Sequence, residues 1–199
     1  MFEIAEYIGI IAFAMSGFFI GVRNNLDLLG VFIATFLTAL GGGIVRDVIV
    51  DRTPYTFANN PPAIIVLVVM TLLILFKYHQ RDSIENKPLF LLSDTIGLVS
   101  FSITGALIAM EAGLNATGVL ALAFVTAVGG GIVRDVIINE VPFVFKTGFY
   151  GMVSLLVAIF LYLLNSYEMM STYSIMAVFV VCVVIRLVAI YRKWSIPLI

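Results

Sequence analysis

A nine-residue motif, GGGIVRDVI, occurs twice and constrains the fold more than any other feature of this sequence. It occupies residues 41–49 and returns at residues 129–137, 88 residues later. The same shift aligns residues 8–57 with residues 96–145 without a gap, and it pairs Gly17 with Gly105 and Pro54 with Pro142. Internal similarity at a fixed spacing indicates that one structural unit is used twice. We therefore expect two similar halves.

The composition places both halves in a membrane. Hydrophobic residues make up 62% of the chain and charged residues only 12%, against about a quarter charged in a soluble domain. The net charge of -1 offers no basic surface for nucleic acid, so membrane lipid is the partner that we expect. The first apolar run follows Glu3 and Glu6 and no basic residue, which is unlike a signal peptide, so it should remain as a membrane span.

Seven segments are apolar over about the length that a membrane-spanning helix needs. They are residues 4–22, 28–50, 61–76, 94–110, 112–138, 147–167 and 169–190. The sequence thus predicts an all-α integral membrane protein. We expect a first three-helix repeat at residues 1–88, a second at 89–168, and a seventh helix with a short tail at 169–199. Because three spans are an odd number, the second repeat should be inserted upside down, as an inverted repeat.

Basic residues near the span ends indicate the orientation, because they favour the cytoplasmic side. With the N-terminus outside, the outer side receives Arg52 alone. The inner side then receives Arg23, Lys77, Arg81, Lys87, Lys146, Arg192 and Lys193. We therefore expect an outer N-terminus and a cytoplasmic C-terminus.

The triple glycines Gly41, Gly42, Gly43 and Gly129, Gly130, Gly131 lie within predicted spans. Each glycine costs a helix about 1 kcal/mol relative to alanine, so a compensating role is expected. One interpretation is close helix packing, which small residues permit. The other is that the helix kinks or unwinds and exposes its carbonyl oxygens to a water-filled path. Interrupted helices at matching positions of two inverted halves are typical of a transport site.

Each motif also places an arginine beside an aspartate, as Arg46–Asp47 and Arg134–Asp135. A charge at mid-membrane costs about 2.5–3.5 kcal/mol on insertion scales, so these side chains should face protein or a pore and not lipid. Neighbours on a helix project about 100° apart. We therefore expect crossed pairs, Arg46 with Asp135 or Arg134 with Asp47, or both of these crossed pairs at opposite ends of a pore. The alternative is that the arginines reach the interface and mark the span ends.

Several polar residues accompany the motifs. Hydroxyl groups that are candidates for lining a polar path belong to Ser16, Thr38, Thr104 and Thr126. The alternative for each is a hydrogen bond to its own helix backbone. Asp94, at the start of the fourth predicted span, is a candidate acid at the pore mouth, and Glu6 is its repeat equivalent. An acid at a helix start is also favoured by the helix dipole alone.

The sequence offers no constellation for catalysis. His79 is the sole histidine and lies in a polar loop, which argues against a metal cluster or a histidine base. We expect no enzyme, no metal and no cofactor.

The duplicated GGGIVRDV, in the second span of each three-span unit, resembles the trimeric intracellular cation (TRIC) channel family in its prokaryotic form. The resemblance implies a homotrimer in a prokaryotic plasma (inner) membrane. Each protomer would hold a potassium-permeable pore between the second and fifth spans, which kink at the glycines. Bacterial proteins with the same repeat are also described as glycine transporters.

Three functions remain open at this point. The first is a channel for potassium or sodium. The second is a secondary transporter of a small zwitterion such as glycine, whose carboxylate would meet an arginine or a helix N-terminus. The third is a scaffold without transport, which would leave the four charges of the motifs unexplained.

Overall fold

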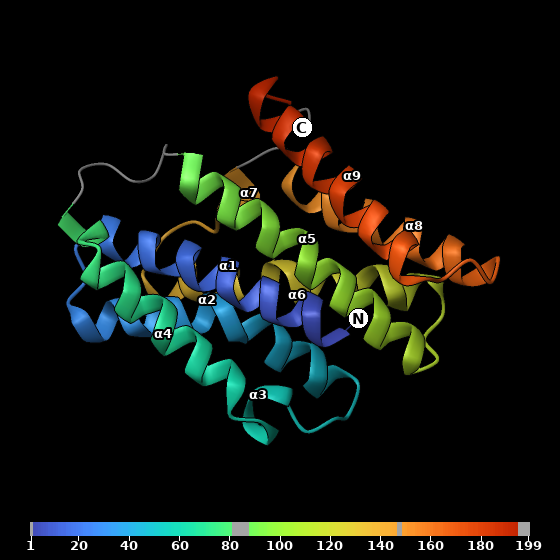
Figure 1. Ribbon diagram of the computed structural model, residues 1–199, viewed down its shortest axis with the longest axis horizontal. Helices are drawn as coiled ribbons and strands as arrows, with labels where there is room; N and C mark the ends of the chain where they lie inside the picture. Colours follow the sequence, from blue (N-terminus) through green and yellow to red (C-terminus); the bar gives the residue numbers. More distant parts are fainter. Residues whose placement is uncertain (1, 81–87, 147–148, 195–199) are drawn as a thin grey trace.

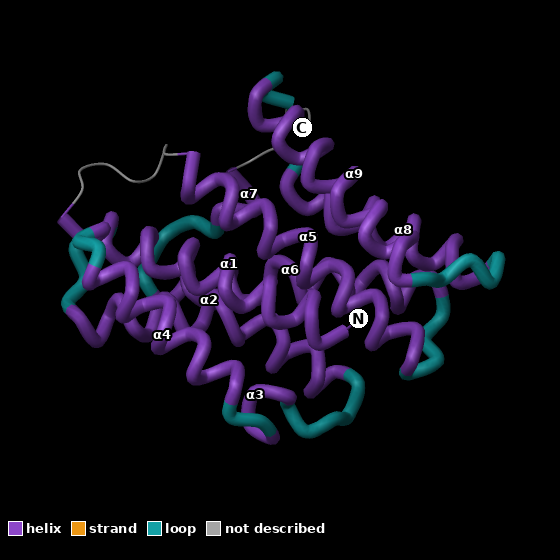
Figure 2. Tube along the Cα trace, viewed as in Figure 1, coloured by secondary structure: helices purple, strands orange, loops and turns teal. Residues whose placement is uncertain are grey.

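The protein is described by a computed structural model that covers residues 2–80, 88–146 and 149–194. Over these residues the chain consists of helices and loops, with no strand (Figure 2). In chain order the helices are α1 (Phe2–Arg23), α2 (Leu28–Ile49), α3 (Tyr55–Ala58), α4 (Pro61–Leu75), η1 (Tyr78–Gln80), α5 (Pro88–Glu111), α6 (Ala116–Ile137), α7 (Phe143–Lys146), α8 (Tyr150–Ser166) and α9 (Thr172–Tyr191).

Seven of these helices correspond to the seven predicted spans. Five are long and apolar enough to cross a membrane, namely α1, α2, α5, α6 and α9, whereas α4 and α8 are shorter apolar helices. The prediction of an all-helical membrane protein is confirmed. Of the residues used in the prediction, Arg81, Lys87 and the expected start of the sixth span, Thr147, lie outside the described residues.

The predicted start of the fifth span was wrong by one helical turn, because a polar cap sets it. The Asn115 side chain accepts a hydrogen bond from Gly118 N at 2.9 Å, so α6 begins at Ala116 and not at residue 112. At the equivalent position Asp27 caps α2 through Gly30 N at 2.7 Å. A side-chain oxygen that accepts from the third backbone amide is the usual N-cap. Both halves therefore start their second long helix in the same way.

Four long helices form the centre of the molecule. α1 packs against α2 and α5, and α6 packs against α2 and α5, so the four helices close a ring. α4 flanks the first half, against α1 and α2, and α8 flanks the second half, against α5 and α6. Figure 1 shows α4 on one side of this centre, with α8 and α9 on the other. α9 packs against α5 and α8 and has no counterpart in the first half.

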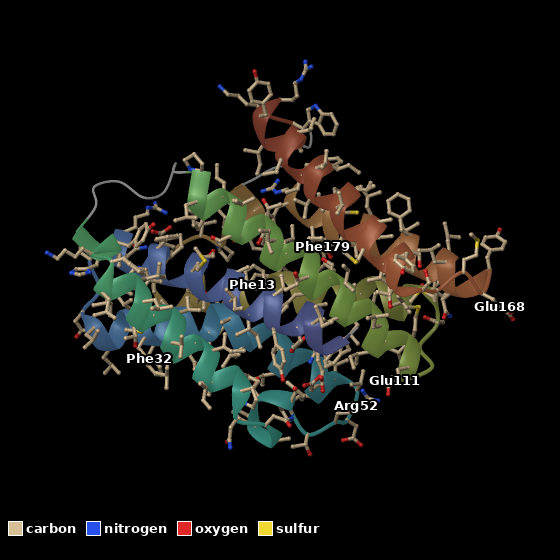
Figure 3. All side chains as sticks on the ribbon, in the orientation of Figure 1. Phe13, Phe32, Arg52, Glu111, Glu168 and Phe179 are labelled. Atoms are coloured by element: carbon tan, nitrogen blue, oxygen red, sulfur yellow. The ribbon has the colours of Figure 1, made fainter. Side chains whose placement is uncertain are left out.

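α1 and α5 interlock through equivalent residues. Phe13 fills the space at Gly97, and Phe101 fills the space at Gly9, where a side chain on either glycine would collide with the ring. The two rings meet edge to face with their centroids 5.1 Å apart, and Phe13 lies in the middle of the molecule (Figure 3). The pair joins the two halves at the core.

Two ion pairs join the two halves. The repeat relates the positions of one pair to those of the other, but with arginine and glutamate exchanged. Arg52 contacts Glu111 at 2.9 Å, and Arg23 contacts Glu140 at 3.9 Å. The shift of 88 residues places Arg23 on Glu111 and Arg52 on Glu140, so the first half supplies both arginines. Figure 3 shows Arg52 and Glu111 side by side at one edge of the molecule. The hydrogen bond from Arg52 to Glu111 raises the pKa of Arg52.

Candidate functional site

The two triple glycines meet where α2 crosses α6. A Cβ atom on Gly42 would collide with the carbonyl oxygen of Thr126, and one on Gly130 would lie 2.6 Å from the carbonyl oxygen of Thr38. Gly41 faces the Cα atom of Gly130 across the same contact. The two backbones therefore touch, which only glycine allows.

Both helices continue through their glycines without interruption, α2 to Ile49 and α6 to Ile137. The expectation that the helix unwinds at the glycines is therefore not met, because close packing of α2 on α6 keeps the helical hydrogen bonds intact. The packing interpretation accounts for the glycines in this conformation. A kink that opens the crossing remains a prediction.

The third glycine of each motif faces an arginine. A Cβ atom on Gly43 would lie 3.2 Å from Glu6 Oε1 and 3.7 Å from Arg46 Nη2, and one on Gly131 would lie 3.8 Å from Arg134 Nη2. The distances to both arginines are ordinary contacts for a side chain, and only the distance from Gly43 to Glu6 is tight.

Arg46 is fully buried and holds two carboxylates. Its Nη1 and Nη2 donate to the two oxygens of Glu6, at 2.7 and 3.2 Å, and its Nε donates to Asp47 Oδ1 at 2.7 Å. Nη1 also donates to Thr104 Oγ1 at 3.1 Å, and the guanidinium lies 5.1 Å from the centre of the Phe2 ring. Burial of a charge is costly unless the charge is paired and hydrogen-bonded. Arg46 meets this condition, because each of its side-chain nitrogens has a hydrogen-bond partner.

Arg134 has the equivalent place in the second half, but with different partners. Its Nε and Nη2 contact Asp135 Oδ1 at 2.8 and 2.7 Å, and its Nη1 donates to Thr38 Oγ1 at 3.3 Å. Thr38 lies one turn before Gly42 on α2, and Arg46 lies one turn after it. The two arginines are therefore on opposite sides of the glycine crossing.

The predicted crossed pairs were wrong, because each arginine bonds the aspartate that follows it in sequence. Neighbouring Cβ atoms on a helix do point apart, but the arginine side chain is long enough to turn back to the carboxylate. The other oxygen of each aspartate accepts a backbone N–H from the next short helix, Tyr55 N for Asp47 and Phe143 N for Asp135, both at 2.8 Å. These bonds hold each carboxylate near the end of its helix. The alternative with both crossed pairs at opposite ends of a pore was wrong for the same reason, although the two observed pairs do lie on opposite sides of the crossing.

Tyr55, which caps this arrangement in α3, also shares a hydrogen bond with Tyr7 of α1. The two hydroxyl oxygens lie 2.8 Å apart. This hydrogen bond raises the pKa of the Tyr55 phenol, so Tyr55 is neutral at physiological pH.

The predicted hydroxyl residues are all buried, and they divide into two groups. Thr126 donates to the Leu122 carbonyl of its own helix at 2.6 Å, as the alternative of a bond to the helix backbone predicts. Thr38 also bonds its own helix, through Ala34 O, but it accepts from Arg134 as well. Thr104 accepts from Arg46, and Ser16 donates to Asp94 Oδ1 at 3.1 Å. Three of the four hydroxyls therefore contact the charged groups.

Asp94 does not start a span, because α5 begins six residues earlier, at Pro88. It is buried and bonds Ser16, and its second partner is the hydroxyl of Tyr150. Glu6, at the equivalent position, bonds Arg46 directly. The aspartate is one methylene group shorter, and here it contacts Ser16 and Tyr150.

The sequence interpretation missed a third buried arginine, Arg186, on α9. Its exposed fraction is 3%, and its guanidinium lies 4.9 Å from the centre of the Tyr150 ring. A single arginine within the apolar run of residues 172–191 was the available signal. We call Glu6, Arg46, Asp47 and Thr104 the Arg46 cluster, and Asp94, Arg134, Asp135, Tyr150 and Arg186 the Arg134 cluster.

A small polar cavity lies within the Arg134 cluster. Its wall includes Thr38, Asp94, Arg134, Asp135 and Tyr150, and its volume is about 10 Å³. This volume is about the space that one water molecule requires. The polar groups on this side of the crossing are thus brought together, but the space between them is nearly closed.

Comparison with known proteins identifies the family. The model of a family described as glycine transporter matches residues 3–79 and again residues 91–166. The chain is 31% identical over 195 residues to the UPF0126 membrane protein YvgT of Bacillus subtilis, covering 98% of this chain and 95% of that protein. This chain belongs to the UPF0126, or glycine transporter, family. The two matched segments correspond to the two halves of the repeat.

Two further relatives of the UPF0126 family agree over shorter lengths. A membrane protein of Deinococcus radiodurans is 40% identical over 137 residues, which cover 69% of this chain and 63% of that protein. The inner membrane protein YadS of Escherichia coli is 30% identical over 146 residues, 73% of this chain and 70% of that protein. The family is one of membrane proteins and not of enzymes.

Solved structures show that this UPF0126 protein has the TRIC channel fold. One, from work on conductance through TRIC cation channels, superposes with a TM-score of 0.88 at 31% identity and covers 100% of this chain and 97% of that one. A prokaryotic TRIC channel crystallised in 0.5 M KCl gives a TM-score of 0.87 at 28% identity and covers 98% of each chain. The TRIC trimeric intracellular cation channel orthologue of Rhodobacter sphaeroides, at 24% identity and with a TM-score of 0.87, shares the fold over 97% of this chain and 98% of its own.

Proposed function

We propose that the protein is a channel for monovalent cations, potassium or sodium, with one pore in each protomer between the second and fifth spans, α2 and α6. The observation that carries the proposal is the full-length likeness to prokaryotic TRIC cation channels. The two buried clusters on either side of the glycine crossing add a reason that belongs to this chain.

The charge balance of the two clusters together, three arginines and four carboxylates, favours cations over anions. A buried arginine beside a pore would repel a cation, but Arg46 faces two carboxylates, Glu6 and Asp47. Arg134 faces Asp135, with Asp94 within electrostatic reach. Charges buried inside a membrane protein usually face its interior or a water-filled path and mark where ions pass.

The conformation described here is a closed one in this proposal. The backbones of α2 and α6 touch at Gly42 and Gly130, and the cavity beside them holds about one water. Opening requires the two helices to bend or separate at the glycines, which are the predicted kink. The path would then have a vestibule on each side of the crossing. The Arg46 cluster would form the charged wall of one vestibule, and the Arg134 cluster that of the other.

The assembly and location follow from the relatives. We propose a homotrimer, since a structure of the same fold is named a trimeric channel, and a prokaryotic inner membrane, since the relative in Escherichia coli is named an inner membrane protein. The basic residues favour an outer N-terminus and a cytoplasmic C-terminus. The two three-helix repeats, residues 1–88 and 89–168, would then be inserted with opposite orientations.

One observation favours the alternative, a transporter of a small zwitterion such as glycine. The cavity of the Arg134 cluster brings an arginine and two carboxylates together, which is the charge arrangement that an amino acid requires, and the family model is described as a glycine transporter.

Planar bilayers that contain the purified protein separate the two functions. A channel gives unitary current steps that reverse at the potassium equilibrium potential, whereas a carrier gives saturable glycine uptake without steps. Arg134→Ala should change the potassium conductance severalfold, while Arg192→Ala, at the exposed end of α9, should leave it near the wild-type value. Saturable uptake without unitary steps would refute the channel proposal and support the transporter.

A further inference from the structure

Arg186 adds a positive charge to one side of the crossing from outside the repeat. It lies on α9, which packs against α5 and α8 and has no equivalent in the first half. Its guanidinium covers the Tyr150 ring, and the Tyr150 hydroxyl bonds Asp94. Among the described residues its Nε has no hydrogen-bond partner. Within the same part of the chain Arg186 makes no ion pair with a carboxylate, and Asp94 and Tyr150 interact with its charge through space.

This arginine makes the two buried clusters unequal in charge. The buried charged residues of the described chain are Glu6, Arg46, Asp47, Asp94, Arg134, Asp135 and Arg186. In the Arg46 cluster one arginine faces two carboxylates, so its formal net charge is -1. In the Arg134 cluster two arginines face two carboxylates, so its formal net charge is zero. Without Arg186 both clusters would carry the same charge of -1.

We propose that Arg186 makes ion conduction directional by removing the negative charge from one vestibule. The inference rests on the proposed channel function. Cations concentrate at the vestibule of the Arg46 cluster and are not concentrated at the vestibule of the Arg134 cluster. In equal salt on both sides, the cation current that enters at the Arg46 cluster is therefore larger than the current in the opposite direction.

The size of the effect follows from the Coulomb energy of one charge. At about 8 Å in a medium close to water, a unit charge changes the local cation concentration about two-fold, and by more where the effective dielectric constant is lower. In about 0.01 M salt the screening length is about 30 Å, so the difference is retained, whereas about 1 M salt reduces the length to about 3 Å. The current ratio should therefore approach one as the salt concentration increases.

The test is the ratio of single-channel currents at equal positive and negative voltages, in dilute KCl on both sides. Patches excised from giant spheroplasts are suitable, because biosynthesis gives every channel the same orientation. The wild type should show a ratio of about two or more. Arg186→Gln should bring the ratio to about one by increasing the smaller current, and Arg186→Lys, which keeps the charge, should preserve the wild-type ratio.

The opposite cluster offers a second and independent variant. Glu6→Gln brings the net charge of the Arg46 cluster to zero, so it should also bring the ratio to about one, but by decreasing the larger current. The double variant Glu6→Gln with Arg186→Gln exchanges the two charge states and should reverse the direction of the larger current. Arg192→Gln changes an exposed charge on the same helix and serves as the matched control.

The outcomes distinguish the inference from the function on which it rests. No unitary current in the wild type would overturn the channel function and the inference together. A wild-type current with a ratio of one in dilute salt, or an unchanged ratio in Arg186→Gln, would overturn the inference alone. If Arg186→Gln does not assemble, Glu6→Gln still decides, because a ratio that it leaves unchanged rules out the charge difference between the clusters.

Discussion

Arg46 is buried in an apolar helix bundle, yet each of its side-chain nitrogens donates a hydrogen bond. Glu6 takes two of these bonds and Asp47 takes one. Arg134 bonds one carboxylate and a threonine, and Arg186 lies over an aromatic ring. The number of carboxylates in direct contact thus decreases from two at Arg46 to one at Arg134 and, among the described residues, none at Arg186. Removing a carboxylate should therefore lower the free energy of unfolding most at Arg46.

Glu6→Ala should lower the free energy of unfolding by about 3–5 kcal/mol, because it leaves a buried guanidinium without its bidentate partner. Equilibrium unfolding in mixed micelles measures the change. Glu6→Gln should cost less, since the amide oxygen still accepts a hydrogen bond. Glu3→Ala is the control, because Glu3 is exposed on the same helix. Equal losses for Glu3→Ala and Glu6→Ala would show that the ion pair contributes nothing specific.

At the scale of helices, the three glycines of one motif make different contacts. Gly42 and Gly130 bring two backbones into contact, whereas Gly43 and Gly131 lie beside the arginines at ordinary contact distance. A Cβ atom on Gly129 would lie 3.7 Å from the Cα atom of Gly42, which is ordinary contact. A motif that is identical in both halves is therefore used unequally, because the two crossing surfaces are not perfectly symmetric.

The different contacts of the motif glycines predict different costs in stability for the same substitution at different positions. Gly42→Ala places a methyl group against the Thr126 carbonyl, and overpacking of this kind costs about 1–3 kcal/mol. Gly129→Ala meets no tight contact and gains helix propensity of about 1 kcal/mol, so its stability should be unchanged or increased. Thermal unfolding of the two purified variants in one detergent makes the comparison. A Gly129→Ala variant as unstable as Gly42→Ala would indicate that the crossing is looser, or differently placed, than described.

At the scale of the whole molecule, the repeat predicted the architecture but not the contacts. Seven apolar runs and one motif repeated after 88 residues were sufficient for the helices and their pairing into halves. The partners of Arg46 and Arg134 could not be derived in this way, because equivalent positions hold side chains of different length, such as Glu6 and Asp94. Arg186 was outside the repeat altogether, so symmetry gave no reason to place it beside Asp94.

The proposed orientation, with the N-terminus outside, predicts which loops face the cytoplasm, and this can be tested on the intact protein. The single cysteine, Cys182, is buried, so a new exposed cysteine reports its own position. Thr53, before α3, and His79, after α4, are both exposed and are separated by one span.

With the N-terminus outside, a membrane-impermeant maleimide should label Thr53→Cys in intact cells, and it should label His79→Cys only after the membrane is opened. Basic residues concentrate on the side of His79, which is the physical reason for this orientation. The wild type, with Cys182 alone, is the unlabelled control. Labelling of His79→Cys but not Thr53→Cys in intact cells would reverse the orientation and would place the vestibule of the Arg46 cluster on the cytoplasmic side. Labelling of both in intact cells would contradict a span at α4, which is the shortest of the seven apolar helices.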